Sequence, residues 1–449
     1  MEPQSTSTKN AIEKALLVNV TLPSAPLLPK ESLAELGSLA EAAGLQVVHE
    51  TYQKRSRINP ALYVGKGKAE DLALRADQSG ADVIIFDNDL SPGQIRELEK
   101  IVGRKIIDRS ELILDIFAGR ARTHEAKLQV ELAQLEYVYP RLTRMWGHLD
   151  TVVGAGGGGK AGAVGGVGTR GPGEKQLEID RRLVKKRLNF LRSQIEEIQK
   201  RKSRQVQARH DHFTVSLVGY TNAGKSTLMN TLTGTGTFTA NQLFATLDTK
   251  TSRWNLGLEY SVLLSDTVGF VRDLPHHLVA SFRATLEEAT HADLLLHVVD
   301  VSHPQAEMQM QAANKVLEEL GCDKKDMLLL FNKVDRVDGR HSRDLMRTLY
   351  PEALPISART GAGVDQVVQA VITRLIGQKV RVRVACSQAD GKIPSFLRAH
   401  GEVHSTVYQD SITIMEATIG RRQLFNLQRL GPITCDLLTP ESGPLALAK

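Results

Sequence analysis

The chain has 449 residues, which is too long for one hydrophobic core and indicates about two to four domains. A hydrophobic content of 41% and a charged content of 24% are typical of a water-soluble globular protein, and no apolar run reaches the roughly 18 residues that a membrane span needs. The formal net charge is only +6 and the three cysteines lack metal-ligand spacing, so we expect reduced thiols and a cytoplasmic protein without a signal peptide.

Residues 11–117 are predicted to form a small α/β domain. Apolar runs and amphipathic segments alternate along it, with strands expected at 15–20, 47–50 and 83–87 and helices at 31–43, 69–79 and 91–102. Within it, Gly65, Lys66, Gly67 and Lys68 form a glycine and lysine turn before a helix. Two interpretations stay open, a phosphate-binding turn for a second nucleotide such as ATP or a tight turn with solvated lysines.

Residues 118–211 carry two long helical patterns around a glycine-rich stretch at 147–173. The apolar positions of the first helix are Leu128, Leu132, Leu135, Tyr139 and Leu142, and those of the second are Leu177, Val184, Leu188, Leu191, Ile195 and Ile198. We expect Pro140 to kink or end the first helix. Two apolar seams joined by a flexible tip predict an antiparallel helical hairpin that projects from the body.

The second helix of this hairpin is strongly basic. Residues 174–209 hold twelve Lys or Arg against five Asp or Glu, a net +7, while residues 213–376 carry −3. The groups Arg181-Arg182 and Lys185-Lys186-Arg187 favour contacts with nucleic-acid phosphates. A solvated helix surface is the alternative.

Residues 212–376 alternate strands with helices, as a mostly parallel, doubly wound sheet requires. A strand expected at 213–218 leads into a glycine turn with the phosphate-loop pattern, followed by a helix. Lys225 is expected to bind the β- and γ-phosphates and Ser226 to ligate Mg²⁺. The expected contacts with the nucleotide are Gly219, Tyr220, Thr221, Asn222, Ala223, Gly224, Lys225, Ser226 and Thr227.

Three further motifs follow in the order that a guanine-nucleotide-binding domain requires, each after an apolar run. Asp266 is expected to hold Mg²⁺ through water, and the Gly269 N–H to reach the γ-phosphate. The Asp335 carboxylate can accept hydrogen bonds from the guanine N1–H and exocyclic amine, a donor pair that adenine lacks. The motifs are Asp266, Thr267, Val268 and Gly269; Asn332, Lys333, Val334 and Asp335; and Ser357, Ala358 and Arg359, where the Ala358 N–H would meet the guanine O6.

The candidate catalytic residues are Lys225, Thr246, Gly269 and Phe270. Thr246 is expected to ligate Mg²⁺, with Thr249 as the alternative, in a switch segment whose other expected nucleotide contacts are Phe244, Ala245 and Leu247. Phe270 stands where many GTPases carry the Gln that orients the attacking water. We therefore expect slow hydrolysis of GTP to GDP and phosphate by the protein alone, with Phe270 gating the step or simply packing in the switch.

Asn222 occupies a position that binds a monovalent cation in several GTPases with similar loops. It predicts stimulation by K⁺, and an internal hydrogen bond is the alternative. Beyond this domain, residues 377–438 are predicted to form a small α+β domain with strands at 380–385 and 411–415 and a helix at 396–401.

Several stretches between residues 59 and 300 resemble the HflX family, and the segment at 243–249 resembles the wider Obg–HflX superfamily of translation-factor-class GTPases. They are Asn59-Pro60 with 64–68, Gln134-Leu135-Glu136-Tyr137, Pro140-Arg141-Leu142, 170–178 and 266–271. The nucleotide motifs extend the match to Ala358. The stretch between Leu149 and Gly168 is longer and richer in glycine than the family pattern.

The resemblance implies an N-terminal α/β domain with a helical arm, a P-loop GTPase domain and a small C-terminal domain. It also implies binding to the large ribosomal subunit and the splitting of stalled ribosomes under stress, and the ribosome is then the partner expected to stimulate hydrolysis. We expect the protein to be a monomer. Arg144, Trp146 and Arg170 would then lie near ribosomal RNA, and Lys66 and Lys68 would be candidates for an N-terminal ATP site. A large-subunit assembly GTPase, a signalling switch with a protein partner and an ATP-driven RNA remodeller are the alternatives.

Overall fold

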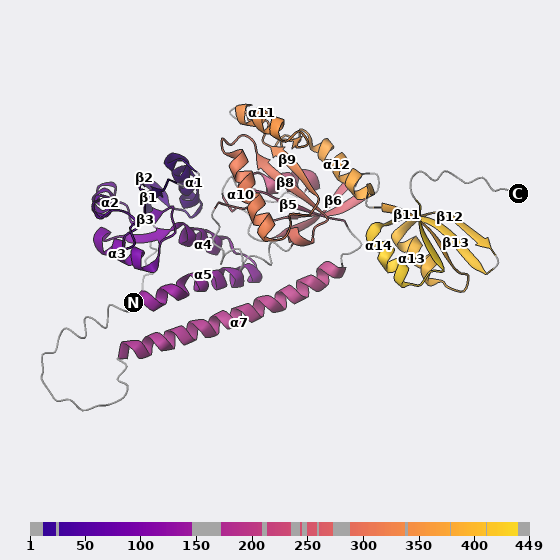
Figure 1. Cartoon of the computed structure of the whole chain (residues 1–449), viewed down its shortest axis with the longest axis horizontal. Coiled ribbons are helices and arrows are strands. Elements are labelled where there is room, and N and C mark those ends of the chain that lie inside the picture. The colour runs from indigo at the N-terminus through magenta and orange to yellow at the C-terminus, as the bar shows by residue number, and fades with distance from the viewer. Residues whose placement is uncertain are drawn as a thin grey trace, which may run out of the picture.

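The computed structural model shows three sheets in sequence, with a long helical arm beneath the first two (Figure 1). It describes residues 12–23, 27–145, 172–208, 213–234, 243–244, 249–257, 260–272, 288–336, 340–377, 379–409 and 411–438. The predicted fold class is confirmed, while the residue limits of the domains stay predictions.

The N-terminal sheet is parallel and has the order β2-β1-β3-β4. Its elements are β1 (Lys14–Thr21), α1 (Pro29–Ala42), β2 (Gln46–Lys54), α2 (Lys66–Ser79), β3 (Val83–Phe86), α3 (Pro92–Val102), β4 (Lys105–Asp108) and α4 (Arg109–Arg120). The start of α3 follows from its sequence, because Ser91 and Gln94 form a capping box around Pro92. Neither β4 nor α4 was predicted from the sequence.

The arm consists of α5 (His124–Met145) and α7 (Pro172–Ala208), which lie side by side (Figure 1). Leu128 and Leu132 of α5 pack with Leu188, Leu191 and Ile195 of α7, as the apolar seams predicted. Of the two expectations for Pro140, that it ends the first helix is wrong, because α5 continues through it to Met145, while a kink at this position stays a prediction.

The packing of α5 explains why the proline is tolerated. A second face of α5, which includes Val130, Ala133 and Tyr137, is buried in the core of the N-terminal domain. Packing against both the domain and α7 offsets the backbone hydrogen bond that a proline removes. The predicted tip at 147–173 lies almost wholly outside the described residues, as do Trp146 and Arg170.

The central sheet has the order β10-β9-β8-β5-β7-β6, and all its neighbouring strands are parallel except the edge pair β6–β7. Helices follow β5, β8, β9 and β10, as the predicted alternation requires, while β6 and β7 follow each other directly as a hairpin. The elements are β5 (Thr214–Val218), α8 (Lys225–Thr233), β6 (Lys250–Gly257), β7 (Tyr260–Asp266), β8 (Leu294–Asp300), α10 (Ala306–Glu319), β9 (Met327–Asn332), α11 (Arg340–Leu349), β10 (Leu354–Pro355) and α12 (Val364–Gly377).

The C-terminal sheet is antiparallel and has the order β12-β13-β11-β14. Its βαββαβ chain order is that of ferredoxin-like domains. The elements are β11 (Lys379–Ser387), α13 (Lys392–His400), β12 (Gly401–Gln409), β13 (Ile412–Gly420), α14 (Arg421–Arg429) and β14 (Thr434–Leu438). The sequence predicted β11, α13 and β13 but missed both edge strands, which carry few buried residues and so lack a clear alternation.

One hydrophobic core spans the N-terminal and central sheets. It joins Leu36 of α1 and Phe117 of α4 to Val218, Phe270 and Leu295 of the central domain. The C-terminal sheet has a separate core around Val384, Leu397 and Met415. Within the described part of the chain, no helix is both long and apolar enough to cross a membrane.

Candidate functional site

The phosphate-loop sequence forms a turn between β5 and α8 that only glycine permits at two points. Gly219 has a φ of +142°, and a Cβ there would lie 2.2 Å from the carbonyl oxygen of Val298. Gly224 has a φ of +98°, and its Cβ would lie 2.3 Å from Asn332 Nδ2. Gly224 is the N-cap of α8 and offers no side-chain cap, so the first N–H groups of the helix face an anion site.

Lys225 is the first residue of α8 and is only 6% exposed. Its ammonium group donates to the carbonyl oxygens of Gly219 at 3.0 Å and Tyr220 at 2.8 Å. Burial lowers the pKa of Lys225 to about 8, while the Asp266 carboxylate acts in the opposite direction. A phosphate group beside the ammonium would favour its charged form in the same way.

The expected magnesium ligands Ser226 and Asp266 lie together. The Ser226 hydroxyl donates to Asp266 Oδ2 at 2.5 Å, and Asp266 ends β7 at 2% exposure. A hydroxyl and a carboxylate oxygen are ligands that Mg²⁺ prefers, so the pair fits a magnesium ion beside the phosphates. Thr246, the third expected ligand, lies outside the described residues together with Ala245 and Leu247.

The segment after β7 lies against the phosphate loop. The Phe270 N–H donates to the Gly219 carbonyl at 3.1 Å, and the Phe270 carbonyl accepts from the Thr221 N–H at 2.7 Å. A Cβ on Gly269 would lie 2.8 Å from Thr221 Cα and 2.9 Å from Lys225 Nζ. The structure thus brings Gly269 next to Lys225. The Thr267 hydroxyl donates to the Leu217 carbonyl at 2.6 Å, and Val268 is buried.

Two phenylalanines expected at the nucleotide point instead into the core shared with the N-terminal domain. The side chain of Phe270 is 1% exposed and that of Phe244 is 2% exposed. Phe244 meets Phe117 of α4 edge to face, with ring centroids 4.7 Å apart. In this arrangement only the backbone of Phe244 and Phe270 is available for contact with a nucleotide.

The guanine-type motifs converge at the ends of β9 and β10. The Asn332 side chain accepts from the Ala358 N–H at 2.9 Å and donates to the Ala223 carbonyl at 2.7 Å. Asn332 therefore links the motif that contains Ala358 to the phosphate loop. Lys333 has a φ of +64° and pairs with Asp300 at 2.7 Å. Asp335 and Arg359 are exposed beside the partly buried Val334 and the buried Ser357.

A group of buried charges beside this site did not stand out in the sequence. Arg109 is 2% exposed and pairs with Asp87 at 2.7 Å and with Glu35 at 2.8 Å. Arg272 pairs with Asp87 at 3.2 Å, and the Tyr220 hydroxyl donates to Glu35 at 2.5 Å. The sequence feature that could have indicated this group is the position of Asp87 and Arg109, which directly follow the buried strands β3 and β4.

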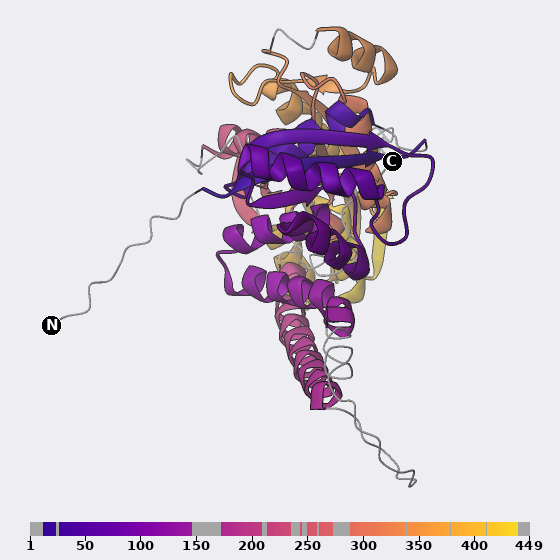
Figure 2. The same ribbon diagram turned by 90° about the vertical axis from the view of Figure 1, so that its left-hand side faces the viewer.

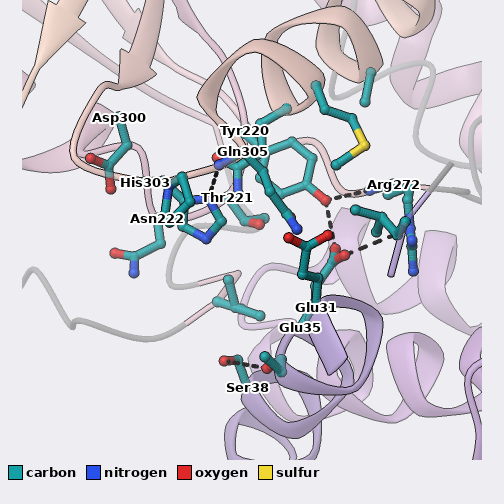
Figure 3. A pocket seen from close by; sticks show the side chains of 17 residues that line it. Glu31, Glu35, Ser38, Tyr220, Thr221, Asn222, Arg272, Asp300, His303 and Gln305 are labelled. Atoms are coloured by element: carbon teal, nitrogen blue, oxygen red, sulfur yellow. Dashed lines mark hydrogen bonds and ion pairs between the residues drawn. The ribbon is translucent and has the colours of Figure 1, made fainter. Parts of the chain in front are cut away.

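A cavity of about 360 Å³ opens beside these charges, between α1, the phosphate loop and the start of α10 (Figure 3). Glu31 and Glu35 of α1 line it on one side, and Asn222, Asp300 and His303 line it on the other (Figure 3). Burial lowers the pKa of His303, whose Nδ1 accepts from the Gln305 N–H at 3.1 Å. The cavity is thus lined by residues of both the N-terminal domain and the phosphate loop.

The glycine and lysine turn at 65–68 is placed at the start of α2. Lys68 is 13% exposed and donates to Thr51 and Asp71, each at 2.8 Å. Lys66 is 79% exposed and lies 4.0 Å from Glu70. Lys68 therefore already has an acidic partner, while Lys66 projects into solvent.

The central sheet, the phosphate loop and the guanine-type motifs define a P-loop GTPase. Residues 30–118 and 120–209 match the family models described as GTP-binding GTPase N-terminal and GTP-binding GTPase Middle Region. Residues 214–333 match the model described as 50S ribosome-binding GTPase.

Comparison with curated proteins identifies the family within the P-loop GTPases. The chain is 42% identical over 394 residues to GTPase HflX of Lacrimispora saccharolytica, covering 87% of this chain and 90% of the relative. It is 43% identical over 368 residues to GTPase HflX of Escherichia coli K12, covering 81% and 84%. The chain belongs to the HflX family of GTPases and is a GTP hydrolase.

Among solved structures, a GTP-binding protein from the archaeon Sulfolobus solfataricus in complex with GDP is similar. The match has a TM-score of 0.43 and 24% identity, and it covers 81% of this chain and 98% of that one.

Proposed function

We propose that this GTPase binds the large ribosomal subunit and splits stalled ribosomes into subunits under stress in the cytoplasm. The observation that carries the proposal is the basic surface of α7, where Arg181, Arg182, Lys185 and Lys186 are all exposed. Arg187 and Arg192 of the same helix are instead paired with Glu131 and Glu136 of α5. Arg187 and Arg192 are also exposed, but each already pairs with a glutamate of α5, so the first four are the better candidates for phosphate contacts.

These four side chains suit ribosomal RNA because phosphates are read by clustered, solvent-facing cations. The family-model description of residues 214–333 names a 50S partner, which supports the same choice. Each phosphate contact releases counterions, so binding should weaken steeply as salt rises. A monomer acting as a wedge, with GTP ordering the switches and hydrolysis releasing the factor, accounts for the combination of arm and GTPase.

The roles of the site residues in GTP hydrolysis are part of this proposal. Lys225 binds the β- and γ-phosphates, Ser226 and Thr246 ligate Mg²⁺, and Asp266 holds the ion through water. Gly269 donates its N–H to the γ-phosphate and Asp335 reads guanine. Phe270 supplies no hydrogen bond to the attacking water, so hydrolysis is slow until the ribosome completes the site.

Two additional ligands remain proposals. K⁺ beside Asn222 would stimulate hydrolysis, and equal rates in K⁺ and Na⁺ at matched ionic strength would rule it out. ATP at the turn of Lys66 and Lys68 would require Lys68 to leave Asp71, to which it is paired at 2.8 Å. A large-subunit assembly GTPase, a signalling switch and an ATP-driven RNA remodeller are the competing functions.

Sedimentation of purified ribosomes tests the proposal. Intact ribosomes should shift to subunits in the presence of the protein with GTP or a non-hydrolysable analogue, and removal of residues 150–168 should weaken the effect. Reversing the charge of the four α7 cations to Glu should abolish binding. The matched control reverses four exposed cations elsewhere, which are Lys324, Arg347, Lys392 and Arg398. Intact ribosomes that neither bind the protein nor separate would refute the splitting function.

A further inference from the structure

Two large apolar side chains of α7 lie on its solvent side. Leu183 is 58% exposed and Phe190 is 51% exposed. They are two helical turns apart, so one lies almost directly above the other along the helix. The seam that packs on α5 follows a different side of α7, through Leu188, Leu191 and Ile195. Figure 1 and Figure 2 both show α7 outside the three sheets, so a partner can reach this side of the helix.

The ring of Phe190 is held in place from one side. Arg187, one turn earlier, has its guanidinium carbon 5.4 Å from the centre of the ring. That guanidinium group is itself fixed, because it donates to Glu131 of α5 through Nε at 2.7 Å and through Nη2 at 2.8 Å. A guanidinium group and an aromatic ring attract each other in this arrangement. Phe190 therefore has a supported ring, and about half of the residue stays exposed for contact with a partner.

The charged residues of α7 around these two side chains are all cations. Residues 181–195 hold six Lys or Arg and no Asp or Glu. Lys186 is exposed and precedes Phe190 by one turn, so it lies between Leu183 and Phe190 on the same side of the helix. A partner that fits this surface carries negative charge close to flat or apolar groups. Single-stranded RNA has both, because phosphates and bases alternate along its chain.

The supported ring favours a base over a side chain of a protein partner. An acidic protein surface would also pair with the cations, and its apolar side chains would pack on any apolar group of α7. Stacking is more demanding because it needs a ring, and here Arg187 already orients one. Unpaired bases stack on such exposed rings in proteins that bind single-stranded RNA, and they do so without regard to sequence because every base has a flat face.

We infer that Phe190 is a stacking site for an unpaired base of RNA, with Arg187 supporting the ring and Lys186 contacting a neighbouring phosphate. Leu183 extends the apolar surface along the bound strand. The inference rests on the proposed function, since it names the part of the ribosomal RNA that the arm binds. It makes stacking a second source of affinity, beside the phosphate contacts of the α7 cations.

Fluorescence anisotropy with labelled oligonucleotides separates the base from the phosphate. The probes are single-stranded oligo(A) and an abasic oligonucleotide of the same length, which has the same phosphates and no bases. The full-length protein is kept with GDP and Mg²⁺ throughout, and the variants are Phe190→Ala, Phe190→Trp and Phe190→Leu. Tyr408→Ala is the matched control, because Tyr408 is an aromatic residue of the C-terminal domain with 65% exposure. Circular dichroism checks that each variant keeps its helix content.

The unaltered protein and Tyr408→Ala should bind oligo(A) about tenfold more tightly than the abasic probe, whereas Phe190→Ala should bind both probes alike. Phe190→Trp should keep the preference for oligo(A) because it also offers a ring, and Phe190→Leu should lose it. The slope of log K against log salt should stay unchanged in Phe190→Ala, because no phosphate contact is lost. Lys186→Gln should have the opposite effect, since it keeps the preference and makes the slope shallower by about 0.7.

Purified large ribosomal subunits provide the second readout. At fixed salt, Phe190→Ala should bind them about tenfold more weakly than the unaltered protein does. Subunits that do not bind the unaltered protein would refute the ribosomal proposal alone, and the oligonucleotides would still decide the inference.

Three results would overturn the inference. The first is an unaltered protein that does not distinguish oligo(A) from the abasic probe. The second is a preference for oligo(A) that survives in Phe190→Ala or Phe190→Leu, because the ring would then be unnecessary. The third is equal binding of the unaltered protein and Phe190→Ala to large subunits.

Discussion

The two outer sheets of this chain have four strands each, yet they are related to the GTPase domain in opposite ways. The N-terminal sheet is parallel, and the core on one of its faces continues into the GTPase domain through Phe117, Phe244 and Phe270. The C-terminal sheet is antiparallel and closes a core of its own. A parallel sheet needs cover on both faces, and here the GTPase domain contributes to that cover. The nucleotide site and the N-terminal domain should therefore respond to each other, while the C-terminal domain should not.

The ion pairs of the two sheets show the same contrast. Arg109 in the N-terminal domain has 3% of its side chain exposed and pairs with two carboxylates that are also largely buried. Arg383 in the C-terminal domain has 53% exposed and pairs with Glu416, which Arg381 also contacts. Buried pairs are costly to break, whereas surface pairs contribute little.

The largest expected effect comes from Arg109→Ala. The change leaves Asp87 and Glu35 buried without this cation, and it should lower the free energy of unfolding by about 3–5 kcal/mol. Denaturation followed by the fluorescence of Trp254, which is buried in the GTPase domain, measures it. A loss below about 1 kcal/mol would mean that the two domains do not share their stability.

Acid should destabilise the GTPase domain through His297, which lies 1% exposed on β8. Burial, with a smaller effect of Lys225, lowers the pKa of His297 from 6.5 to about 4. The unfolded chain therefore binds the proton more readily, and stability should fall by about 3 kcal/mol as the pH drops from 6.5 to 4. His297→Gln should flatten this part of the pH profile. The exposed His404 of the C-terminal sheet provides the control, since His404→Gln should leave the profile unchanged.

GDP with Mg²⁺ at a hundred times its Kd should stabilise the GTPase domain by about 2.7 kcal/mol. Because the core is shared, hydrogen exchange should slow in β1 and α1 of the N-terminal domain as well as in β5 and α8. Exchange in β11 and β13 should not change. Protection confined to the GTPase domain would contradict the coupling.

The smallest effect is expected for Arg383→Ala. The Arg383 side chain is half exposed, and Arg381 still pairs with Glu416 after the change, so the unfolding free energy of the C-terminal domain should fall by less than about 1 kcal/mol. Raising the salt concentration should remove most of what remains. A loss as large as that of Arg109→Ala would show that exposure does not separate the two kinds of pair.

Much of the GTPase site was predictable because its motifs are local. Gly219 and Gly224 are required by one turn, and Lys225 and Ser226 follow that turn directly, so their spacing along the chain fixes their spacing in space. The pairing of Ser226 with Asp266 has a different reason. Asp266 ends β7, and Ser226 lies in the helix that follows the neighbouring parallel strand β5, so both residues come to the same edge of the sheet. The helix that runs through Pro140 was not predictable, because its support comes from two separate packing partners.

The sequence by itself determined the class of protein, the nucleotide motifs, the seams of the arm and its positive charge. Only the tertiary structure decided that Phe244 and Phe270 face the N-terminal domain and that the Tyr220 hydroxyl meets Glu35 and Arg272. These contacts join residues up to 185 positions apart, as between Tyr220 and Glu35. No local propensity encodes such a contact, because it depends on how two independently formed sheets pack into one core.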